Sequence, residues 1–144
     1  MNQIDKILIG SDHAGFELKT KIIEHLAPKQ YTIIDIGTNS DKSTDYSTYA
    51  HKVGAITYPK TMGILICGSG NGMVMTANKW ESARAALCWN LETTKLARQH
   101  NDANILCLPA RFISTTQALE MVDAFLTTEF EGGRHTQRVN NIKI

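Results

Sequence analysis

Five short apolar runs recur along the chain with helical patterns between them, and this alternation constrains the fold more than any other feature. None of the runs shows strict apolar–polar alternation, so both faces of each strand should be covered. The runs cover residues 6–10, 31–36, 62–67, 84–88 and 104–108, and the helical patterns cover residues 15–26, 47–57, 71–79, 92–100 and 115–127. This order predicts a three-layer α/β/α sandwich, Rossmann-like, around a five-stranded parallel sheet.

Size and composition predict a single domain over residues 1–144. The 144 residues are 42% hydrophobic and 20% charged, which is enough to bury a sizeable core. Lys and Arg number 15 against 14 acidic residues, so no global charge favours nucleic acid or an anionic membrane. No apolar run approaches the roughly 18 residues of a membrane span, and no signal peptide precedes the first strand. We therefore expect a cytoplasmic protein whose partners include neither nucleic acid nor membrane.

The three cysteines differ in their surroundings. They form no C-x-x-C pair, and an odd number without a secretory signal favours reduced thiols. Cys88 and Cys107 lie inside apolar runs, where a thiol is usually an inert part of the core. Cys67 instead ends a predicted strand and opens a glycine-rich turn. The turn residues are Gly68, Ser69, Gly70, Asn71 and Gly72.

This glycine-rich turn matches no nucleotide-binding motif. Met73 stands where a dinucleotide motif needs glycine, and the Gly-Lys-Ser/Thr of a Walker A loop is absent. Successive glycines nevertheless let backbone N–H groups converge on an anion, and the following helix adds the positive end of its dipole. The same field favours the thiolate form of Cys67. Two interpretations remain open, an anion site with chemistry and a merely tight strand-to-helix turn.

Polar residues cluster near the predicted strand ends, where open α/β sheets bind their ligands. Each also has a structural interpretation: Asp12 and His13 could cap a helix, Tyr46 could pack beside a cap, and His100 could interact with a helix dipole. The candidates are Asp12 and His13 after the first strand, Tyr46 at the start of the second helix, His100 and Asn101 before the fifth strand, and Arg111 after it.

The C-terminal tail carries a second set of basic residues. Arg134 and Arg138 are four apart and would share one face of a helix. Paired guanidinium groups suit a phosphate dianion, because they offer planar charged donors to its oxygens. A solvated basic tail is the alternative. A terminal arm of this kind can also reach a neighbouring subunit.

Taken in order, these motifs resemble the type B ribose-5-phosphate isomerases within the ribose/galactose isomerase family. The resemblance runs from the first strand to the tail. The residues that carry it are Gly10-Ser-Asp-His-Ala-Gly-Phe-Glu-Leu-Lys19, Thr44-Asp-Tyr46, Ile66-Cys-Gly-Ser-Gly-Asn-Gly72, Ala77-Asn-Lys79, Arg98-Gln-His-Asn-Asp-Ala-Asn104 and Glu131-Gly-Gly-Arg-His-Thr-Gln-Arg138.

The resemblance implies an isomerase of the non-oxidative pentose phosphate pathway that needs no metal and no cofactor. It converts D-ribose 5-phosphate to D-ribulose 5-phosphate through a cis-enediolate. Cys67 matches the family's proton acceptor, and His100 its ring-opening proton donor. The backbone donors of Gly68, Ser69, Gly70, Asn71 and Gly72 would stabilise the enediolate.

The remaining candidates are implied to bind the substrate. Asp12 and Tyr46 would contact the sugar ring and its hydroxyls, and Asn101 would support the oxyanion or the sugar oxygens. The phosphate would lie against Arg134 and Arg138, with help from Arg111 and His13.

Several alternatives stay open at this point. One branch of the family uses a glutamate as the base at the position of Met73, whose thioether cannot accept a proton. A six-carbon substrate, allose 6-phosphate or galactose 6-phosphate, would suit the same chemistry. A non-catalytic sugar-phosphate binding module would need the arginines and glycines but not Cys67. We expect a homodimer or a dimer of dimers with shared active sites, in which an arm of about residues 131–144 contacts the partner subunit.

Overall fold

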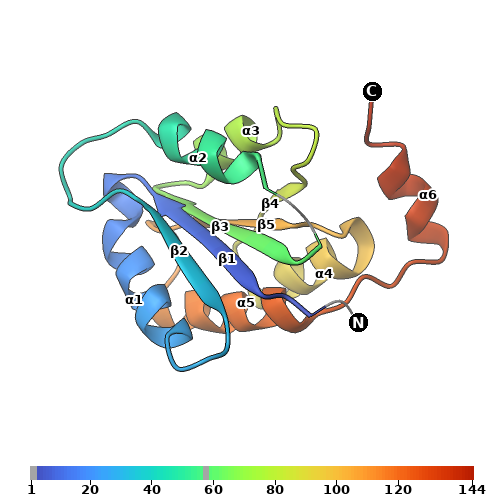
Figure 1. The fold of residues 1–144 in the computed structure, drawn as a ribbon, viewed down its shortest axis with the longest axis horizontal. Helices are drawn as coiled ribbons and strands as arrows, with labels where there is room; N and C mark the ends of the chain where they lie inside the picture. Colours follow the sequence, from blue (N-terminus) through green and yellow to red (C-terminus); the bar gives the residue numbers. More distant parts are fainter. Residues whose placement is uncertain (1–2, 57–58) are drawn as a thin grey trace.

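The computed structural model describes residues 3–56 and 59–144, and its centre is one parallel sheet in the strand order β2-β1-β3-β5-β4 (Figure 1). Each strand lies within one residue of its predicted bounds, so the α/β fold predicted from the sequence is confirmed. The strands are β1 Lys6–Ser11, β2 Thr32–Gly37, β3 Thr61–Cys67, β4 Ala85–Leu87 and β5 Ile105–Pro109.

All five predicted helices are present, and two of them are shorter than predicted. α2 ends at Gly54 rather than Thr57, which itself lies outside the described residues, and α3 ends at Ala77 rather than Lys79. A short 3-10 turn, η1, precedes the first helix, and a further helix forms in the tail. The bounds are η1 His13–Gly15, α1 Phe16–Leu26, α2 Tyr46–Gly54, α3 Asn71–Ala77, α4 Leu91–Asn101, α5 Thr115–Thr127 and α6 Arg134–Asn140.

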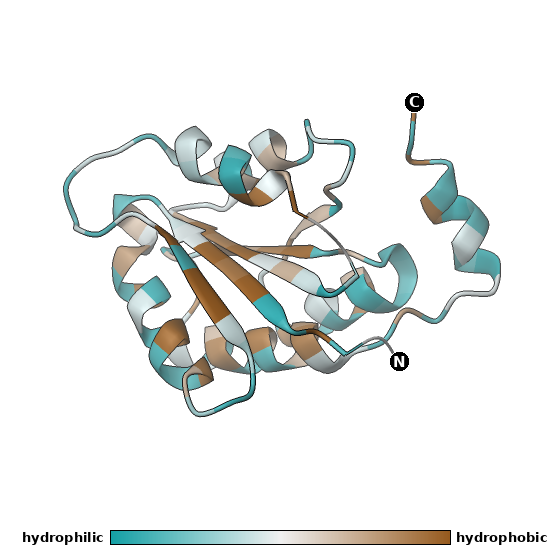
Figure 2. Cartoon of the chain, in the orientation of Figure 1, coloured by the Kyte–Doolittle hydropathy of each residue, from teal (hydrophilic) through white to brown (hydrophobic). Residues whose placement is uncertain are grey.

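The central strands are apolar throughout because each face of the sheet is covered by helices (Figure 2). Along β3, Ile64 and Ile66 pack into the core on the side of α1 and α5. Leu65 and Cys67 pack into a second core with residues of α2 and α3. Alternate residues of one strand therefore serve two apolar layers, which explains why the sequence shows no period of two.

The side on which successive strands are added to the sheet changes between β1 and β3. From β1 the chain first adds β2 on one side and then crosses to add β3 on the other. Such a switch point leaves a crevice outside the carboxyl ends of the two strands. Asp12 follows β1 there, and its N–H donates to the Ile66 carbonyl at 3.2 Å, next to Cys67 at the end of β3.

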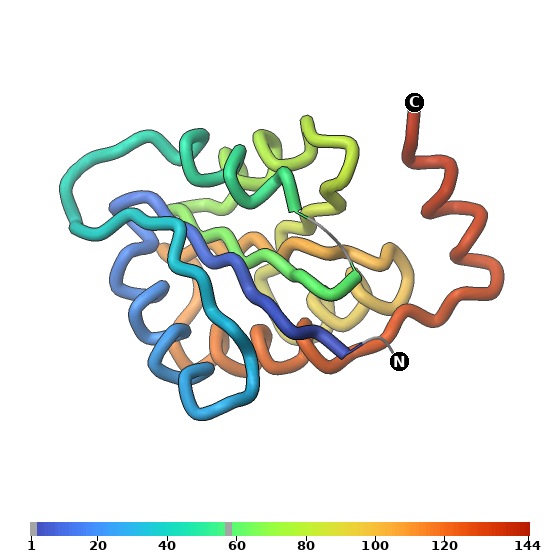
Figure 3. The backbone as a smooth tube through the Cα atoms, in the orientation of Figure 1, coloured from blue at the N-terminus to red at the C-terminus, as the bar shows by residue number. Residues whose placement is uncertain are grey.

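The tail leaves the body of the fold at the end of the sheet where the strands begin, opposite the crevice at their carboxyl ends. After α5, the Glu131 N–H donates to the Gln99 carbonyl near the end of α4 at 3.0 Å. α6 then stands out from the layers, beside α4 and beyond the edge at which the strands begin (Figures 1 and 3). Among the residues described, no helix combines the length and the apolar character needed to cross a membrane.

Candidate active site

A cavity of about 380 Å³ lies at the switch point between β1 and β3. It is lined by residues from the ends of three strands and the start of α2. These residues are Asp12, Tyr46, Cys67, Gly68, Ser69, Gly72, Arg111 and Phe112. Seven of the eight were singled out from the sequence, and the structure brings these seven together at one cavity.

The turn after β3 directs a backbone donor at the Cys67 thiol. The Gly70 N–H donates to Cys67 Sγ at 3.2 Å, and Cys67 is only 4% exposed. The next N–H, of Asn71, donates to the Ser69 hydroxyl at 3.3 Å. The turn thus combines a reactive group with the donors that support it.

Gly70 makes this turn possible in two ways. Its φ of +79° lies in the left-handed region, and an added Cβ would lie 2.4 Å from Leu87 Cδ1. An alanine in the left-handed region costs roughly 1–2 kcal/mol of stability, and the contact with Leu87 adds to this cost. We therefore expect Gly70→Ala to lower the free energy of unfolding by more than the backbone strain alone. Urea unfolding at one fixed protein concentration measures this.

Gly132 supplies the matched control. Its φ is +67°, but the nearest atom to an added Cβ is Thr136 Oγ1 at 3.7 Å. Gly132→Ala therefore bears the backbone strain without the clash. Equal destabilisation of the two variants would show that the packing of Gly70 against Leu87 is unimportant.

Tyr46 enters the cavity from the first turn of α2. Asp45 caps this helix by accepting from the Ser47 N–H at 2.9 Å, and this bond lowers the pKa of the Asp45 carboxyl. The Tyr46 ring lies against Gly72, where an added Cβ would approach its ring carbons to 2.4 Å. The helix-cap interpretation is thus confirmed for Asp45, while Tyr46 both packs and lines the cavity.

Asp12 and His13 have structural partners as well as positions at the site. Asp12 Oδ1 accepts from the Ala14 and Gly15 N–H groups at 3.0 and 3.2 Å, so its cap interpretation is confirmed. His13 Nδ1 accepts from the Thr44 N–H at 3.2 Å. A neutral His13 ring therefore carries its proton on Nε2 and can donate from that atom.

Two neighbouring residues after β5 close the other side of the cavity. The Arg111 N–H donates to the Gly68 carbonyl at 3.1 Å, and the Arg111 side chain covers Gly68. Phe112 is 74% exposed and also lines the cavity. Phe112 was missed in the sequence, where its only signal is its position beside Arg111. An exposed aromatic at this rim leaves apolar surface for another group to cover.

The other two thiols belong to the core, as predicted. Burial raises the pKa of Cys88 to about 11. Burial also raises the pKa of Cys107 well above its ordinary value, and the neighbouring Cys67 and Cys88 add to the effect. Both thiols therefore stay neutral near pH 7, and Cys67 is the cysteine that faces the cavity.

The remaining sequence candidates do not lie at this cavity within one chain, which corrects their grouping with the strand ends. His100 and Asn101 end α4, which runs back to the edge where β5 begins. β5 runs for five residues from that edge to Pro109, which pairs with Cys67. At about 3.3 Å per residue, the strand is roughly 15 Å long. Arg134 and Arg138 lie on α6 at the same distant edge.

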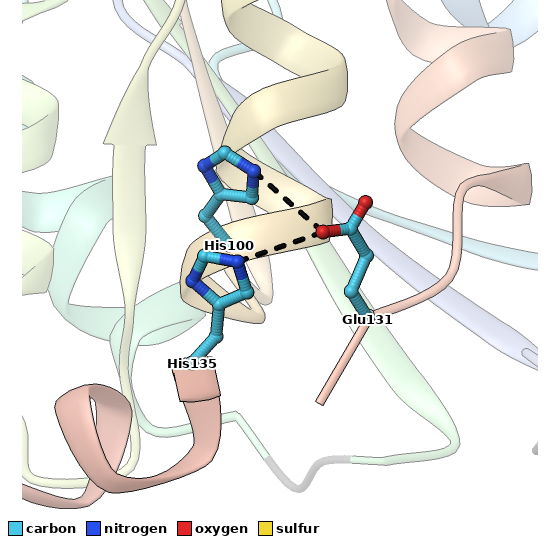
Figure 4. Close-up of side chains that lie close together, drawn as sticks. All are labelled: His100, Glu131 and His135. Carbon is cyan, nitrogen blue, oxygen red and sulfur yellow. Dashed lines mark ion pairs between the residues drawn. The ribbon is translucent and has the colours of Figure 1, made fainter. Parts of the chain in front are cut away.

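His100 meets two other residues at this distant edge. Its ring stacks on that of His135 with centroids 4.2 Å apart, and Glu131 Oε1 lies 3.7 Å from His100 Nε2 and 3.5 Å from His135 Nε2. Burial lowers the pKa of His135, with the neighbouring charges of His100 and Arg134 adding and Glu131 opposing. His100 was a candidate from the sequence, but its meeting with Glu131 and His135 (Figure 4) was not predicted.

Comparison with known proteins gives a consistent result along the whole chain. The sequence model of the Ribose/Galactose Isomerase family matches residues 7–142. Ribose-5-phosphate isomerase B of Escherichia coli K12 is 43% identical over 139 residues, covering 95% of this chain and 93% of that protein.

Solved structures of similar proteins share the fold closely. A ribose 5-phosphate isomerase from Thermotoga maritima is 47% identical with a TM-score of 0.92, covering 96% of this chain and 97% of that one. A ribose-5-phosphate isomerase B from Mycoplasma genitalium, solved with bound ribulose-5-phosphate, is 44% identical with a TM-score of 0.90, covering 97% and 95% of the two chains.

Proposed function

This chain belongs to the ribose/galactose isomerase family, and on that premise we propose that it interconverts D-ribose 5-phosphate and D-ribulose 5-phosphate with Cys67 as the base. The observation that carries the proposal is the Cys67 thiol, which lines a cavity at the switch point and accepts the Gly70 N–H at 3.2 Å. The similar Mycoplasma genitalium structure holds ribulose-5-phosphate, the product of this reaction.

The proton transfer needs a base that works near neutral pH. The Cys67 thiolate takes the C2 proton of the open-chain aldose, and the C2–H electron pair forms the C1–C2 double bond while the carbonyl oxygen at C1 becomes an oxyanion. The thiol then returns this proton to C1, the proton of the C2 hydroxyl passes to the C1 oxygen, and the C2 oxygen becomes the ketone. Preorganised N–H donors of the turn 68–72 stabilise the enediolate oxyanion, an effect worth on the order of 3 kcal/mol of barrier.

The cavity wall supplies groups that suit the rest of a sugar phosphate. Asp12 holds its carboxylate at the switch point and can accept sugar hydroxyls, while the Tyr46 ring forms the opposite wall. The guanidinium of Arg111 in the wall is a donor for phosphate or hydroxyl oxygens, and the Nε2–H of His13, the residue after Asp12 in the chain, is a second donor.

The groups at the distant edge support an active site shared between two copies of the chain. In this proposal His100 opens the ring, and Arg134 and Arg138 bind the phosphate. All three lie on α4 and α6, at the end of the sheet where the strands begin, away from the cavity of their own chain. In a two-fold dimer, the distant edge of each copy lies at the cavity of the other copy, so the dimer contains two equivalent shared sites. The arm of residues 131–144 then contacts the partner subunit, and the exposed Phe112 rim is covered.

The arginine pair gives a direct test of phosphate binding. We expect Arg134→Ala and Arg138→Ala each to raise KM for ribose 5-phosphate by roughly tenfold to a hundredfold, because each removes a charged hydrogen bond worth about 1.5–3 kcal/mol. Both side chains are exposed, so folding should be unaffected. Steady-state kinetics measures the change, with Lys21→Ala on the exposed face of α1 as the charge-matched control. Unchanged KM in both arginine variants would refute the phosphate assignment.

The choice of substrate is tested by a panel of sugar phosphates. Steady-state kcat/KM for ribose 5-phosphate, allose 6-phosphate and galactose 6-phosphate, all with EDTA present, should be highest for ribose 5-phosphate. Preference for a six-carbon sugar would keep the mechanism and replace the substrate. Binding of all three without turnover would favour the non-catalytic module.

A further inference from the structure

The loop between β2 and α2 is held at both ends by one side chain, Tyr49. Thr38, at the start of this loop of residues 38–45, is tied to the end of β1, because its N–H donates to the Ser11 carbonyl at 2.8 Å. Thr44, near the end of the loop, shares a hydrogen bond of 3.0 Å with the Tyr49 hydroxyl. Side-chain hydrogen bonds with Thr38 and Thr44 lower the pKa of the Tyr49 phenol. One hydroxyl in the first turn of α2 therefore closes the base of the loop, which extends past the end of α2 in Figure 1.

The Tyr49 side chain is fixed by packing on the sheet. A Cβ added at Gly37 would lie 3.1 Å from Tyr49 Cε1, and one added at Gly10 would lie 3.3 Å from Tyr49 Cβ. The side chain therefore packs closely on the backbone of β1 and β2. Gly37 is itself held, because its N–H donates to Asp35 Oδ1 at 2.9 Å. The sheet thus sets the position of the Tyr49 hydroxyl, and the hydroxyl in turn sets the position of Thr44.

Thr44 connects Tyr49 to the candidate active site. Its hydroxyl bonds to Tyr49, while its backbone N–H donates to His13 Nδ1 at 3.2 Å. His13 directly follows Asp12, which lines the cavity. A donor at Nδ1 selects the neutral imidazole that carries its proton on Nε2, whereas a ring without that donor has both tautomers open to it. The position of the Thr44 N–H therefore decides whether His13 offers a donor from Nε2.

We propose that Tyr49 is a positioning residue, which holds Thr44 so that His13 presents its Nε2–H to the sugar phosphate. This inference rests on the proposed function, in which His13 donates to substrate oxygens. Of the two tyrosines in the first turn of α2, Tyr46 lines the cavity and Tyr49 packs against the sheet, so Tyr49 acts through its neighbours. A donor that binds the substrate equally before and during the reaction contributes to KM and not to kcat.

Steady-state kinetics with ribose 5-phosphate measures the effect on binding. Tyr49→Phe keeps the packed ring and removes the hydroxyl, so it should raise KM roughly threefold to tenfold and leave kcat within about twofold. Thr44→Val keeps the backbone N–H and the side-chain shape, and it should give the same result. Thr44→Ser restores the hydroxyl and should behave as the wild type. Tyr31→Phe is the matched control, because Tyr31 packs against the core on the side of α1 and α5.

A double-mutant cycle tests whether Tyr49 acts through His13. His13→Ala removes the ring that Thr44 orients, and it should itself raise KM. In this background, Tyr49→Phe should change KM by less than about twofold, because the group that it positions is gone. A further rise in KM as large as in the wild-type background would overturn the proposal, since Tyr49 would then act by another route.

The tautomer of His13 is measured without relying on activity. Protein labelled with ¹⁵N-histidine is studied by long-range ¹H–¹⁵N NMR correlation at pH about 8.5, where an ordinary imidazole is neutral. The signal that is missing from His13→Ala identifies His13. The wild type should show the Nε2–H tautomer, and Tyr49→Phe and Thr44→Val should each show a mixture. An unchanged Nε2–H tautomer in both variants would overturn the proposal, and this result stands even if ribose 5-phosphate is not the substrate.

Discussion

Replacing Cys67 with alanine should lower kcat/KM for ribose 5-phosphate on the order of a thousandfold or more. General bases typically contribute roughly 10²–10⁴-fold, and the cavity offers no obvious substitute for this one. Met73, which takes the place of the alternative family base, is a fully buried thioether. The Asp12 carboxylate already accepts two backbone N–H groups through Oδ1, which holds it as a binding group. The loss should appear in kcat, because alanine removes the base and leaves the phosphate contacts.

Cys88→Ala is the matched control for this loss. Cys88 is fully buried in the opposite core and has a pKa raised to about 11. Its replacement removes a thiol of the same size and should leave kcat within a few-fold. Activity of Cys67→Ala within tenfold of the wild type would assign the proton transfer to another group.

Mixing two inactive variants should restore about a quarter of the wild-type activity. When Cys67→Ala and His100→Ala chains pair at random in equal amounts, half of the dimers contain one chain of each kind. In a two-fold dimer with shared sites, one of the two sites in each mixed dimer then carries both intact residues. Co-expression with different tags, followed by assay of the purified mixed dimer, should give about half of the wild-type value.

A second pair of variants serves as the control, because contaminating wild-type protein would raise the activity of both pairs equally. His100→Ala and the double variant Arg134→Ala/Arg138→Ala carry their changes at the same edge of the sheet. Every site of their mixed dimer therefore contains one of the two defects, and kcat/KM should not be recovered. Absence of recovery in the first pair as well would mean that each site is built from one chain.

The central strands β3 and β5 were predictable because their burial is nearly uniform. β3 and β5 are covered by helices on both faces, so their sequences are continuous apolar runs with clear ends. The order of the strands was not predictable in the same way. β4 is the last strand in the order and pairs with β5, and nothing in the sequence of Ala85–Leu87 specifies that neighbour.

The half of the site around Cys67 was also accessible from the sequence. Asp12, Cys67 and Arg111 each follow a strand directly, so parallel strands bring them to one edge. His100 was grouped with them although it ends a helix. A helix between parallel strands runs antiparallel to them, so its last residue lies at the opposite edge. This general rule separates His100 from Cys67 within one chain.

The cluster around His100 depends on contacts that no local pattern encodes. Glu131 and His135 reach His100 because the segment after α5 folds back and bonds to Gln99. Sequence spacing reveals the Glu131–His135 pair, four residues apart, but not the distant residue that they meet. The path of a terminal segment is set by tertiary contacts rather than by periodicity.

Isotope exchange tests most directly whether Cys67 is the group that removes the C2 proton. Ribose 5-phosphate is incubated with the enzyme in D₂O, and loss of the C2 proton signal is followed by ¹H NMR. The wild-type protein should exchange this proton with solvent during turnover, while Cys67→Ala should leave it in place although the sugar still binds. Exchange by Cys67→Ala at the wild-type rate would contradict the account, because another group would then be the base.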